Sequence, residues 1–346
     1  MINQPALRWG ILGTGNIANQ FAAGVLTARR SRITAVGSRT SQAAQAFADK
    51  YQIKQSHASY QQLLDDRDVD AVYNSLPNTL HHEWTIKALR AGKHVLCEKP
   101  FAVDARQAQE MFDVAAAEKR LLMEAFMYRT HPLIKEVARQ VRAGAIGRLR
   151  HIRTSFCYRT TRIAGNIRFD PALAGGALMD VGCYCLNFSR FFAGAEPLSV
   201  RAAANLHDSG VDDHTAGLLT FPGGLLATFI CAMTVQADNT ATLAGDEGFI
   251  ELPIPWKPPT EDATYVIGRA TPPRQDLAGP RPPSSIAAGP RETRTVSTGG
   301  VGLYGMEADD FAASVLDDSP ATISPADTLG NMTLLDEIRR QVGVTF

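Results

Sequence analysis

The chain lacks an excess of charge of either sign, a cysteine pair motif and a long apolar run, and each absence excludes a class of protein. Its 35 basic and 35 acidic residues balance, so nothing in the composition favours binding to nucleic acid or to an anionic membrane. No apolar stretch is long enough to cross a bilayer. The five cysteines form no Cys-x-x-Cys pair, and the His and Cys residues show no metal-ligand spacing. We therefore expect buried free thiols and no metal site.

The start of the chain shows no export signal. Residues 1–5 lead directly into a strand pattern, without a basic segment, an apolar segment or twin arginines. We expect a cytoplasmic protein. Strands and helices alternate in residues 1–126, whereas most expected strands of residues 127–346 follow one another. This change predicts a first dinucleotide-binding domain and a second domain for substrate binding and oligomerisation, with the last helices able to pack back onto the first.

A glycine-rich turn between the first expected strand and helix indicates a dinucleotide site. Residues 7–12 read as a strand, and the pattern Gly-x-Gly-x-x-Ala comes directly after it. Gly13 permits a tight turn, Gly15 lets a pyrophosphate approach the backbone, and the small Ala18 allows close helix packing. The alternative is a purely structural glycine turn. The cofactor contacts predicted here are Gly13, Gly15, Asn16 and Ile17.

The end of the second expected strand, residues 32–37, bears on the form of the cofactor. NAD enzymes usually place a carboxylate there to bind the ribose 2′-hydroxyl, but this chain has Ser38 and Arg39. Arg39 can stack on adenine and pair with a 2′-phosphate, which favours NADP(H) over NAD(H). The alternative is that Arg39 is an ordinary exposed loop residue.

The most informative stretch is the strand of residues 94–98 together with the two residues directly after it. Three apolar residues suit a strand covered on both faces, and Pro100 ends its pairing. Glu98 and Lys99 then lie at the carboxyl end of a parallel strand, which is where α/β sheets bind ligands. Taken alone, Lys99 is more simply read as a solvated surface lysine.

A neighbouring strand, residues 69–74, ends in a polar loop beside this lysine. Asn78 or the threonine after it can cap the next helix, which closes at a glycine. The loop runs from Leu76 through Pro77 and Asn78 to His81. The alternation of strands and helices up to residue 126 predicts a doubly wound parallel sheet of the Rossmann type.

The second part of the chain is rich in strands without intervening helices. The expected strands are residues 149–158, 198–204, 214–221, 225–234, 239–244 and 249–252. Their succession predicts an α+β domain with a large, mostly antiparallel open sheet. Residues 256–300 are rich in proline, glycine and serine and are expected to be irregular, and two helices, 304–316 and 324–342, finish the chain.

A helix expected over residues 176–192 carries polar groups on one face. Asp180, Tyr184 and Asn187 lie at positions i, i+4 and i+7, apart from its apolar stripe. A carboxylate in an apolar helix needs a partner, and Lys99 provides one if the helix folds back over the strand ends. A core tyrosine is the alternative reading of Tyr184. Arg168, in the preceding loop, is either a substrate contact or solvated.

These motifs together resemble the Gfo/Idh/MocA oxidoreductase family. The resemblance rests on Pro77-Asn78-x-x-His81, on Glu98-Lys99-Pro100 and on the Gly-Gly-x-x-x-Asp-x-Gly-x-Tyr pattern that ends at Tyr184. It implies that Lys99 stands beside nicotinamide and substrate, before an often cis proline bond, and that Asp180 and Tyr184 join it in catalysis. A similar Tyr-Arg-x-His pattern makes Arg129 and His131 candidates for lining the site, against the simpler reading of ordinary backbone hydrogen bonds.

The resemblance implies an NADP-dependent enzyme that interconverts a secondary alcohol and a ketone, or a hemiacetal and a lactone. The substrate would be a sugar, a sugar derivative or a cyclic diol. Tyr184 is the predicted general acid and base, with its phenolate favoured by the positive charges of Lys99 and oxidised nicotinamide. Asp180 would orient Lys99, and a variant in which Lys99 itself shuttles the proton stays open.

The site residues predicted from these arguments form two sets. The cofactor set is Gly13, Gly15, Asn16, Ile17, Ser38, Arg39, Leu76, Pro77, Asn78, His81, Glu98, Lys99 and Arg129, and the substrate set is Lys99, Arg168, Asp180, Tyr184 and Asn187. In the family the open sheet face pairs with another subunit, so a homodimer or homotetramer is expected. The alternative functions are an NAD-dependent glycosidase of the same family and a non-catalytic NADP-binding regulator.

Overall fold

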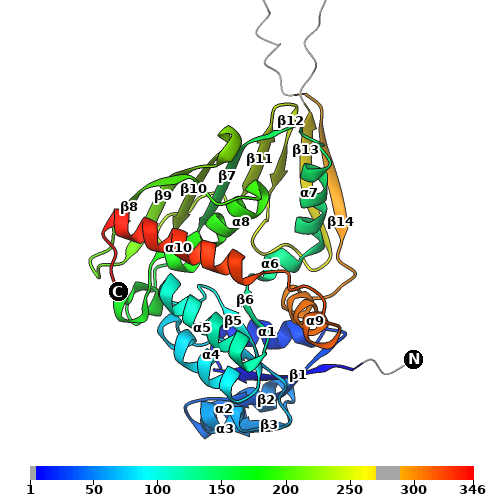
Figure 1. Cartoon of the computed structure of the whole chain (residues 1–346), viewed down its shortest axis with the longest axis vertical. Helices are drawn as coiled ribbons and strands as arrows, with labels where there is room; N and C mark the ends of the chain where they lie inside the picture. The colour runs from blue at the N-terminus through cyan, green and yellow to red at the C-terminus, as the bar shows by residue number, and fades with distance from the viewer. Residues whose placement is uncertain (1–4, 270–288) are drawn as a thin grey trace, which may run out of the picture.

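The computed structural model describes residues 5–269 and 289–346 and contains two sheets (Figure 1). The first sheet has six strands in the order β3-β2-β1-β4-β5-β6, and all of its pairs are parallel. Its strands are β1 (Leu7–Leu12), β2 (Ser31–Gly37), β3 (Gln55–His57), β4 (Ala71–Asn74), β5 (His94–Glu98) and β6 (Leu122–Ala125). The strand order reverses between β1 and β4, which creates the crevice where doubly wound folds bind ligands. The predicted Rossmann sheet is confirmed.

Five helices connect these strands. They are α1 (Asn16–Val25), α2 (Ser41–Tyr51), α3 (Tyr60–Leu64), α4 (His81–Arg90) and α5 (Ala105–Glu118). The predicted cap of α4 is wrong, because a 3₁₀ turn (Asn78–Leu80) precedes the helix and Leu80 occupies the cap position without a side-chain bond. The Asn78 amide instead donates to the carbonyl of Ala174, 2.9 Å away, and so links the loop after β4 to the second half of the chain.

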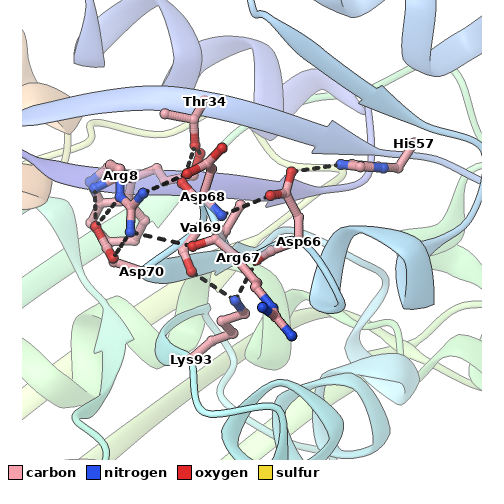
Figure 2. A network of polar contacts seen from close by, with 10 residues as sticks. Arg8, Thr34, His57, Asp66, Arg67, Asp68, Val69, Asp70 and Lys93 are labelled. Carbon is pink, nitrogen blue, oxygen red and sulfur yellow. Dashed lines mark hydrogen bonds and ion pairs between the residues drawn. The ribbon is translucent and has the colours of Figure 1, made fainter.

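A network of polar contacts lies at the amino ends of strands in this sheet, whereas the glycine-rich turn follows the carboxyl end of β1 (Figure 2). Arg8, at the start of β1, binds the Asp70 carboxylate through Nε at 2.9 Å and Nη2 at 2.7 Å. Lys93, just before β5, donates to the carbonyls of Asp66 at 2.6 Å and Val69 at 2.8 Å. These contacts tie the amino ends of three central strands together.

The second sheet has eight strands in the order β14-β13-β12-β11-β7-β10-β9-β8. They are β7 (Leu149–Cys157), β8 (Ser199–Leu206), β9 (Asp212–Thr220), β10 (Leu226–Ala232), β11 (Ala241–Gly245), β12 (Gly248–Leu252), β13 (Asp262–Arg269) and β14 (Arg291–Ser297). All neighbours are antiparallel except β7 and β10, which confirms a mostly antiparallel sheet. The Pro222–Gly224 turn joins β9 to β10 as expected.

The prediction that residues 256–300 are irregular is wrong for two segments. β13 and β14 extend the sheet as an antiparallel pair, and β13 buries Ala263, Tyr265 and Ile267 on alternate positions. The neighbouring prolines and glycines masked this period-two pattern in the sequence. Residues 270–288 of the predicted excursion lie outside the described part of the chain.

The helices of the second half hold the two sheets together. They are α6 (Met127–Thr130), α7 (Pro132–Arg142), a π-helical turn (Leu178–Gly182), α8 (Cys183–Ala193), α9 (Leu303–Leu316) and α10 (Pro325–Val342), and short 3₁₀ turns occur at Ile167–Phe169 and Pro171–Leu173. α8 packs on β7 and β10, and α10 contacts α5, α8 and β8 as it crosses between the sheets (Figure 1). α9 packs back onto α1 of the first domain. The helix expected over 176–192 therefore begins with a π turn, which carries Asp180.

Candidate active site

A cavity of about 1210 Å³ lies where the carboxyl ends of the parallel strands meet the second half of the chain. Its lining runs from the glycine-rich turn, past the end of β2 and the loop after β4, to Glu98 and Lys99 after β5. The opposite wall comes from β7, from the loop before the π turn and from the segment between β12 and β13. One continuous space thus joins the predicted cofactor residues to the predicted catalytic ones.

The glycine-rich turn has the geometry that a pyrophosphate requires. Gly13 has a φ of +95°, which favours glycine, and it makes the tight turn after β1. Gly15 is the N-cap of α1 and provides no side-chain cap, so the first N–H groups of the helix stay free. A Cβ at Gly15 would meet no atom within 4 Å, so it would project into the open cavity. The residues present therefore fit a bound dinucleotide.

Ser38 and Arg39 line the cavity at the end of β2, as predicted, with Tyr60 beside them. Ser38 is buried and Arg39 is exposed. Among the described residues, the only carboxylates that line the cavity are Glu98 and Asp180, which belong to its other end. The end of this space beside β2 therefore contains a cation and, among the described residues, no acid.

The loop after β4 brings Leu76, Pro77, Asn78 and His81 to the cavity wall. The His81 ring is buried between two carbonyl oxygens, with Nδ1 2.9 Å from Pro100 O and Nε2 2.8 Å from Leu76 O. Burial lowers the pKa of His81 to about 4. The ring thus ties the cofactor loop to the Lys99–Pro100 bond, which is cis as the resemblance implies.

Lys99 reaches across the cavity from the end of β5 to the π turn. Its Nζ donates to the Asp180 carbonyl at 2.8 Å and to Asp180 Oδ1 at 3.2 Å. Burial alone would lower the pKa of Lys99, but the negative charge of Asp180 outweighs it and raises the pKa. Lys99 is therefore a positively charged group held by two oxygen atoms of one residue.

Asp180 is the centre of this group of charges. Its Oδ2 accepts hydrogen bonds from the Tyr158 hydroxyl at 2.7 Å and from Arg168 Nε at 2.8 Å. Burial would raise the pKa of Asp180, but the charges of Lys99 and Arg168 hold it well below its usual range. Arg168 is thus brought to the site as predicted, whereas Tyr158 was seen in the sequence only as the last residue of a strand.

Tyr184 lines the same cavity, with the Lys99 ammonium 5.2 Å from the centre of its ring. Its hydroxyl donates to Met127 Sδ at 3.3 Å, and aromatic rings of Phe126, Phe156 and Trp256 surround it. Burial, and then the charge of Glu98, raise the pKa of Tyr184 well above its ordinary value. The expectation that Lys99 and oxidised nicotinamide together favour the phenolate concerns the protein with its cofactor bound, and it stays a prediction.

Glu98 lies beneath Lys99 at the bottom of the cavity. The Tyr73 hydroxyl donates to its carboxylate, and the backbone N–H of Lys99 donates to Oε2 at 3.2 Å. Burial raises the pKa of Glu98. The side chain is buried except for a small part at the cavity wall, where it was predicted to meet the cofactor.

Arg129 and Asn187 do not line the cavity, which corrects two predicted contacts. Arg129 Nη1 binds Asp327 Oδ2 at 2.9 Å and Asn187 Oδ1 at 3.1 Å, and Asn187 also accepts from the Tyr128 hydroxyl at 2.6 Å. Two features explain the difference: α10 covers this side of α8, and the π turn shifts the residues after it relative to Asp180.

His131 is also away from the cavity lining. Its Nδ1 accepts from the backbone N–H of Leu133 at 3.1 Å and caps α7, and its Nε2 lies 3.2 Å from Pro259 O. Its role is therefore the ordinary backbone contact that was the simpler reading of the sequence.

Among the lining residues that were missed in the sequence, two come from one segment. Trp256 and Lys257 come from the proline-rich segment between β12 and β13, which was read as irregular. A tryptophan bracketed by prolines is a hint of a fixed aromatic group, but only the fold shows that it faces the site.

A Rossmann sheet, a glycine-rich turn open to a cavity and a partly buried Lys99–Asp180 pair in the same cavity are features of a nicotinamide-dependent oxidoreductase. Residues 7–126 match the family described as "Oxidoreductase family, NAD-binding Rossmann fold", and residues 134–251 match the "GFO/IDH/MocA C-terminal domain". The chain belongs to the Gfo/Idh/MocA oxidoreductase family, and its first domain is an NAD(P)-binding Rossmann domain.

Similar proteins include an uncharacterized oxidoreductase of Rhizobium meliloti, 33% identical over 96% of both chains. Human trans-1,2-dihydrobenzene-1,2-diol dehydrogenase is 37% identical over 74% of this chain and 77% of its own. A 3-ketoreductase from Actinomadura kijaniata, solved with NADP and TDP-benzene, has a TM-score of 0.82 and 29% identity, covering 97% of this chain and 98% of its own. An aldose-aldose oxidoreductase from Caulobacter crescentus has a TM-score of 0.85 and 26% identity, covering 98% of each chain.

Three further findings concern the described residues. No group of three or more His, Cys, Asp and Glu side chains among them is arranged to hold a metal ion. None of their helices is both long and apolar enough to cross a membrane. All five cysteines are free and buried, as expected.

Proposed function

We propose that the protein is an NADP(H)-dependent oxidoreductase that interconverts a secondary alcohol and a ketone, or a hemiacetal and a lactone. The observation that carries the proposal is the Lys99–Asp180 pair, which lies in the same cavity as the Gly13–Gly15 turn. A nicotinamide cofactor, when bound, supplies or accepts the hydride. The protein has to bind the substrate oxygen and move one proton.

In the direction of reduction, the substrate carbon gains a hydride while its oxygen gains a proton from the Tyr184 hydroxyl. Tyr184 suits this role because it carries a phenolic proton and lines the cavity beside the Lys99 ammonium. A thioether is a weak acceptor, so exchanging Met127 Sδ for a substrate oxygen costs the hydroxyl little. The Lys99 ammonium stabilises negative charge that develops on the same oxygen.

The lining beside these groups supports a hydroxylated ring as the substrate. Phe156 and Trp256 offer aromatic faces, and Tyr158, Arg168 and Asp180 offer hydrogen-bonding groups. This mixture suits a sugar, a sugar derivative or a cyclic diol, which combine an apolar ring face with hydroxyl groups. The names of the diol dehydrogenase and of the 3-ketoreductase agree with this class.

Arg39 supports NADP(H) as the cofactor. It lines the adenosine end of the cavity, where no described acidic residue would repel a 2′-phosphate. The similar 3-ketoreductase was solved with NADP. Arg39→Ala should therefore weaken NADPH binding about tenfold and leave NADH binding within about twofold, as measured by fluorescence titration.

Turnover is tested by NADPH absorbance in both directions on aldoses, inositols, keto-sugars and dihydrodiols, with NAD(H) in parallel. Tyr184→Phe should lower kcat by about 100-fold and remove an ionisation from the kcat pH profile. The matched control is Thr160→Val, which removes another hydroxyl from the cavity wall, one with no assigned role in proton transfer. If Tyr184→Phe left kcat and its pH profile unchanged, the assigned proton donor would be wrong.

We also propose that the open face of the second sheet joins subunits into a homodimer or homotetramer. The face turned away from α8 carries small and apolar side chains on neighbouring strands, including Ala216, Leu218, Leu226 and Ile230. Leu218 and Leu226 are 38% and 41% exposed in the single chain, which is costly for leucine on a flat sheet. Light scattering of the protein and of Leu218→Lys tests this: the variant should have the lower mass.

A further inference from the structure

The segment between β12 and β13, residues 253–259, crosses from the second sheet to the first domain. Lys257 in this segment donates from Nζ to Gln20 Oε1 at 3.1 Å. Gln20 belongs to α1, about one helical turn beyond the first residue of that helix, and both side chains line the main cavity. The Tyr304 hydroxyl reaches the same Gln20 oxygen at 3.3 Å. Lys257 therefore bridges the two halves of the chain above the glycine-rich turn.

The segment holds this lysine in a fixed place. Trp256 is buried, donates from Nε1 to Ser155 O at 2.7 Å, and stacks on Phe156 with an interplanar angle of 4°. Pro255 and Pro258 flank the pair and restrict the backbone on both sides. A side chain on such a segment loses little backbone freedom when it binds a ligand.

No described acidic side chain forms an ion pair with Lys257. Lys99 and Arg168 both pair with Asp180, whereas the hydrogen-bond partner that the structure gives Lys257 is the neutral Gln20 amide. Within residues 5–269 and 289–346 it has no carboxylate partner in an ion pair. Partial burial, and then the positive charge of Lys99, lower the pKa of Lys257. The site therefore carries a cation that an anionic ligand would complete.

We infer that Lys257 is a cofactor-binding residue that exchanges Gln20 for the pyrophosphate of the bound dinucleotide. This inference rests on the proposed function. The pyrophosphate is favoured because Gln20 stands on α1, whose free N-terminal N–H groups and positive dipole end attract phosphate. Lys257 would add the opposite half of the clamp from the second domain, so that both halves of the chain would hold the cofactor.

The test is a fluorescence titration of NADPH into the full-length protein, Lys257→Gln and Lys54→Gln. Lys54 is exposed and away from the cavity lining, so its substitution removes the same charge as a matched control. We expect Lys257→Gln to raise the Kd by about tenfold and to flatten its dependence on salt, and Lys54→Gln to change neither. Lys257→Arg should restore most of the affinity.

Two competing ligands locate the contact. Lys257→Gln should weaken 2′-phospho-ADP-ribose, which contains the pyrophosphate, by the same factor as NADPH. It should leave adenosine 2′-monophosphate, which lacks the pyrophosphate, unchanged. Equal losses for both ligands would overturn the assignment, because the variant would then have disturbed the whole adenosine site.

The remaining outcomes separate the inference from the proposed function. If the unmodified protein bound no dinucleotide, both would fail. If it bound NADPH and Lys257→Gln bound it equally well, only the inference would fail. An unchanged NADPH affinity together with a raised KM for acidic sugars would also overturn it, because Lys257 would then bind an anionic substrate.

Discussion

Two lysines flank the same strand, β5, and they have different surroundings. Lys93 precedes the strand and donates to the carbonyls of Asp66 and Val69 (Figure 2). Lys99 comes after it and donates to Asp180 at the wall of the cavity. Burial lowers the pKa of Lys93, whereas the charge of Asp180 overcomes burial and raises the pKa of Lys99. The lysine before the strand thus has a structural role, and the lysine after it faces the candidate active site.

A lysine at a strand end can act on a substrate only where its partners leave one side of the ammonium open. Lys93 donates to two main-chain carbonyls of one loop. Neither Lys93 nor these two partners line the cavity. Lys99 is bound on one side by Asp180 and faces the cavity on the other. The carboxyl ends of parallel strands offer such open sides because the connecting loops splay apart there.

The largest expected effect is the loss of activity in Lys99→Met. Methionine keeps the length of the side chain but removes the charge beside the substrate oxygen, so kcat should fall about 1000-fold. Steady-state NADPH absorbance measures it, and Lys93→Met is the matched control on the other end of β5. Similar kcat losses per folded molecule in the two variants would remove the distinction between the two lysines.

Arg129→Gln should have the next largest effect, on stability rather than on activity. Arg129 is buried and binds Asp327, so its removal leaves a carboxylate with one cation fewer and should cost about 3 kcal/mol of unfolding free energy. Urea denaturation measures this. Arg142→Gln, which removes an exposed arginine beside the same Phe191 ring, should change the unfolding free energy little. A loss of cofactor affinity at full stability would instead return Arg129 to the site.

Lys93→Met should lower the free energy of unfolding by about 2 kcal/mol, because two carbonyl acceptors lose their hydrogen-bond partner at the amino ends of the strands. The NADPH affinity of the variant should stay within about twofold of that of the unmodified protein. The affected loop lies at the amino ends of the strands, whereas the cavity lies at their carboxyl ends. Urea denaturation and fluorescence titration check the two parts. A stable variant with weakened cofactor binding would contradict the structural role.

A further expected effect concerns the pH dependence of stability and Glu124 of β6, a buried acid away from the cavity. One oxygen accepts from the Phe101 N–H, the other has no partner among the described residues, and burial raises its pKa from 4.5 to about 8. The folded state keeps this proton up to about pH 8, whereas the unfolded chain releases it near pH 4.5, so the stability it contributes falls as pH rises through that window.

Glu124→Gln removes this titration and should reduce the fall in unfolding free energy between pH 5 and pH 8 by about 3 kcal/mol, since one pKa unit corresponds to about 1.4 kcal/mol. Urea denaturation at several pH values measures the slope, with the exposed Glu118→Gln as control. An unchanged slope in Glu124→Gln would show that Glu124 is already ionised in the folded state, as Asp180 is.

The sequence was sufficient for features that depend on local pattern. The strand-turn-helix around Gly13 and Gly15, the buried strand before Lys99 and the parallel order of the first sheet result from periodicity and glycine placement, and the structure confirms them. Asp180 was found because a carboxylate in an apolar helix needs a partner, and Lys99 is that partner.

Features that depend on how distant segments pack were decided only by the tertiary structure. The π turn and α10 moved Asn187 and Arg129 away from the cavity, and the segment between β12 and β13 brought Trp256 and Lys257 into it. Helical spacing assigns a side chain to a face but does not say which segment covers that face. The reason is physical: local hydrogen bonds and side-chain spacing act over a few residues, whereas burial depends on surfaces that meet only after the chain has folded.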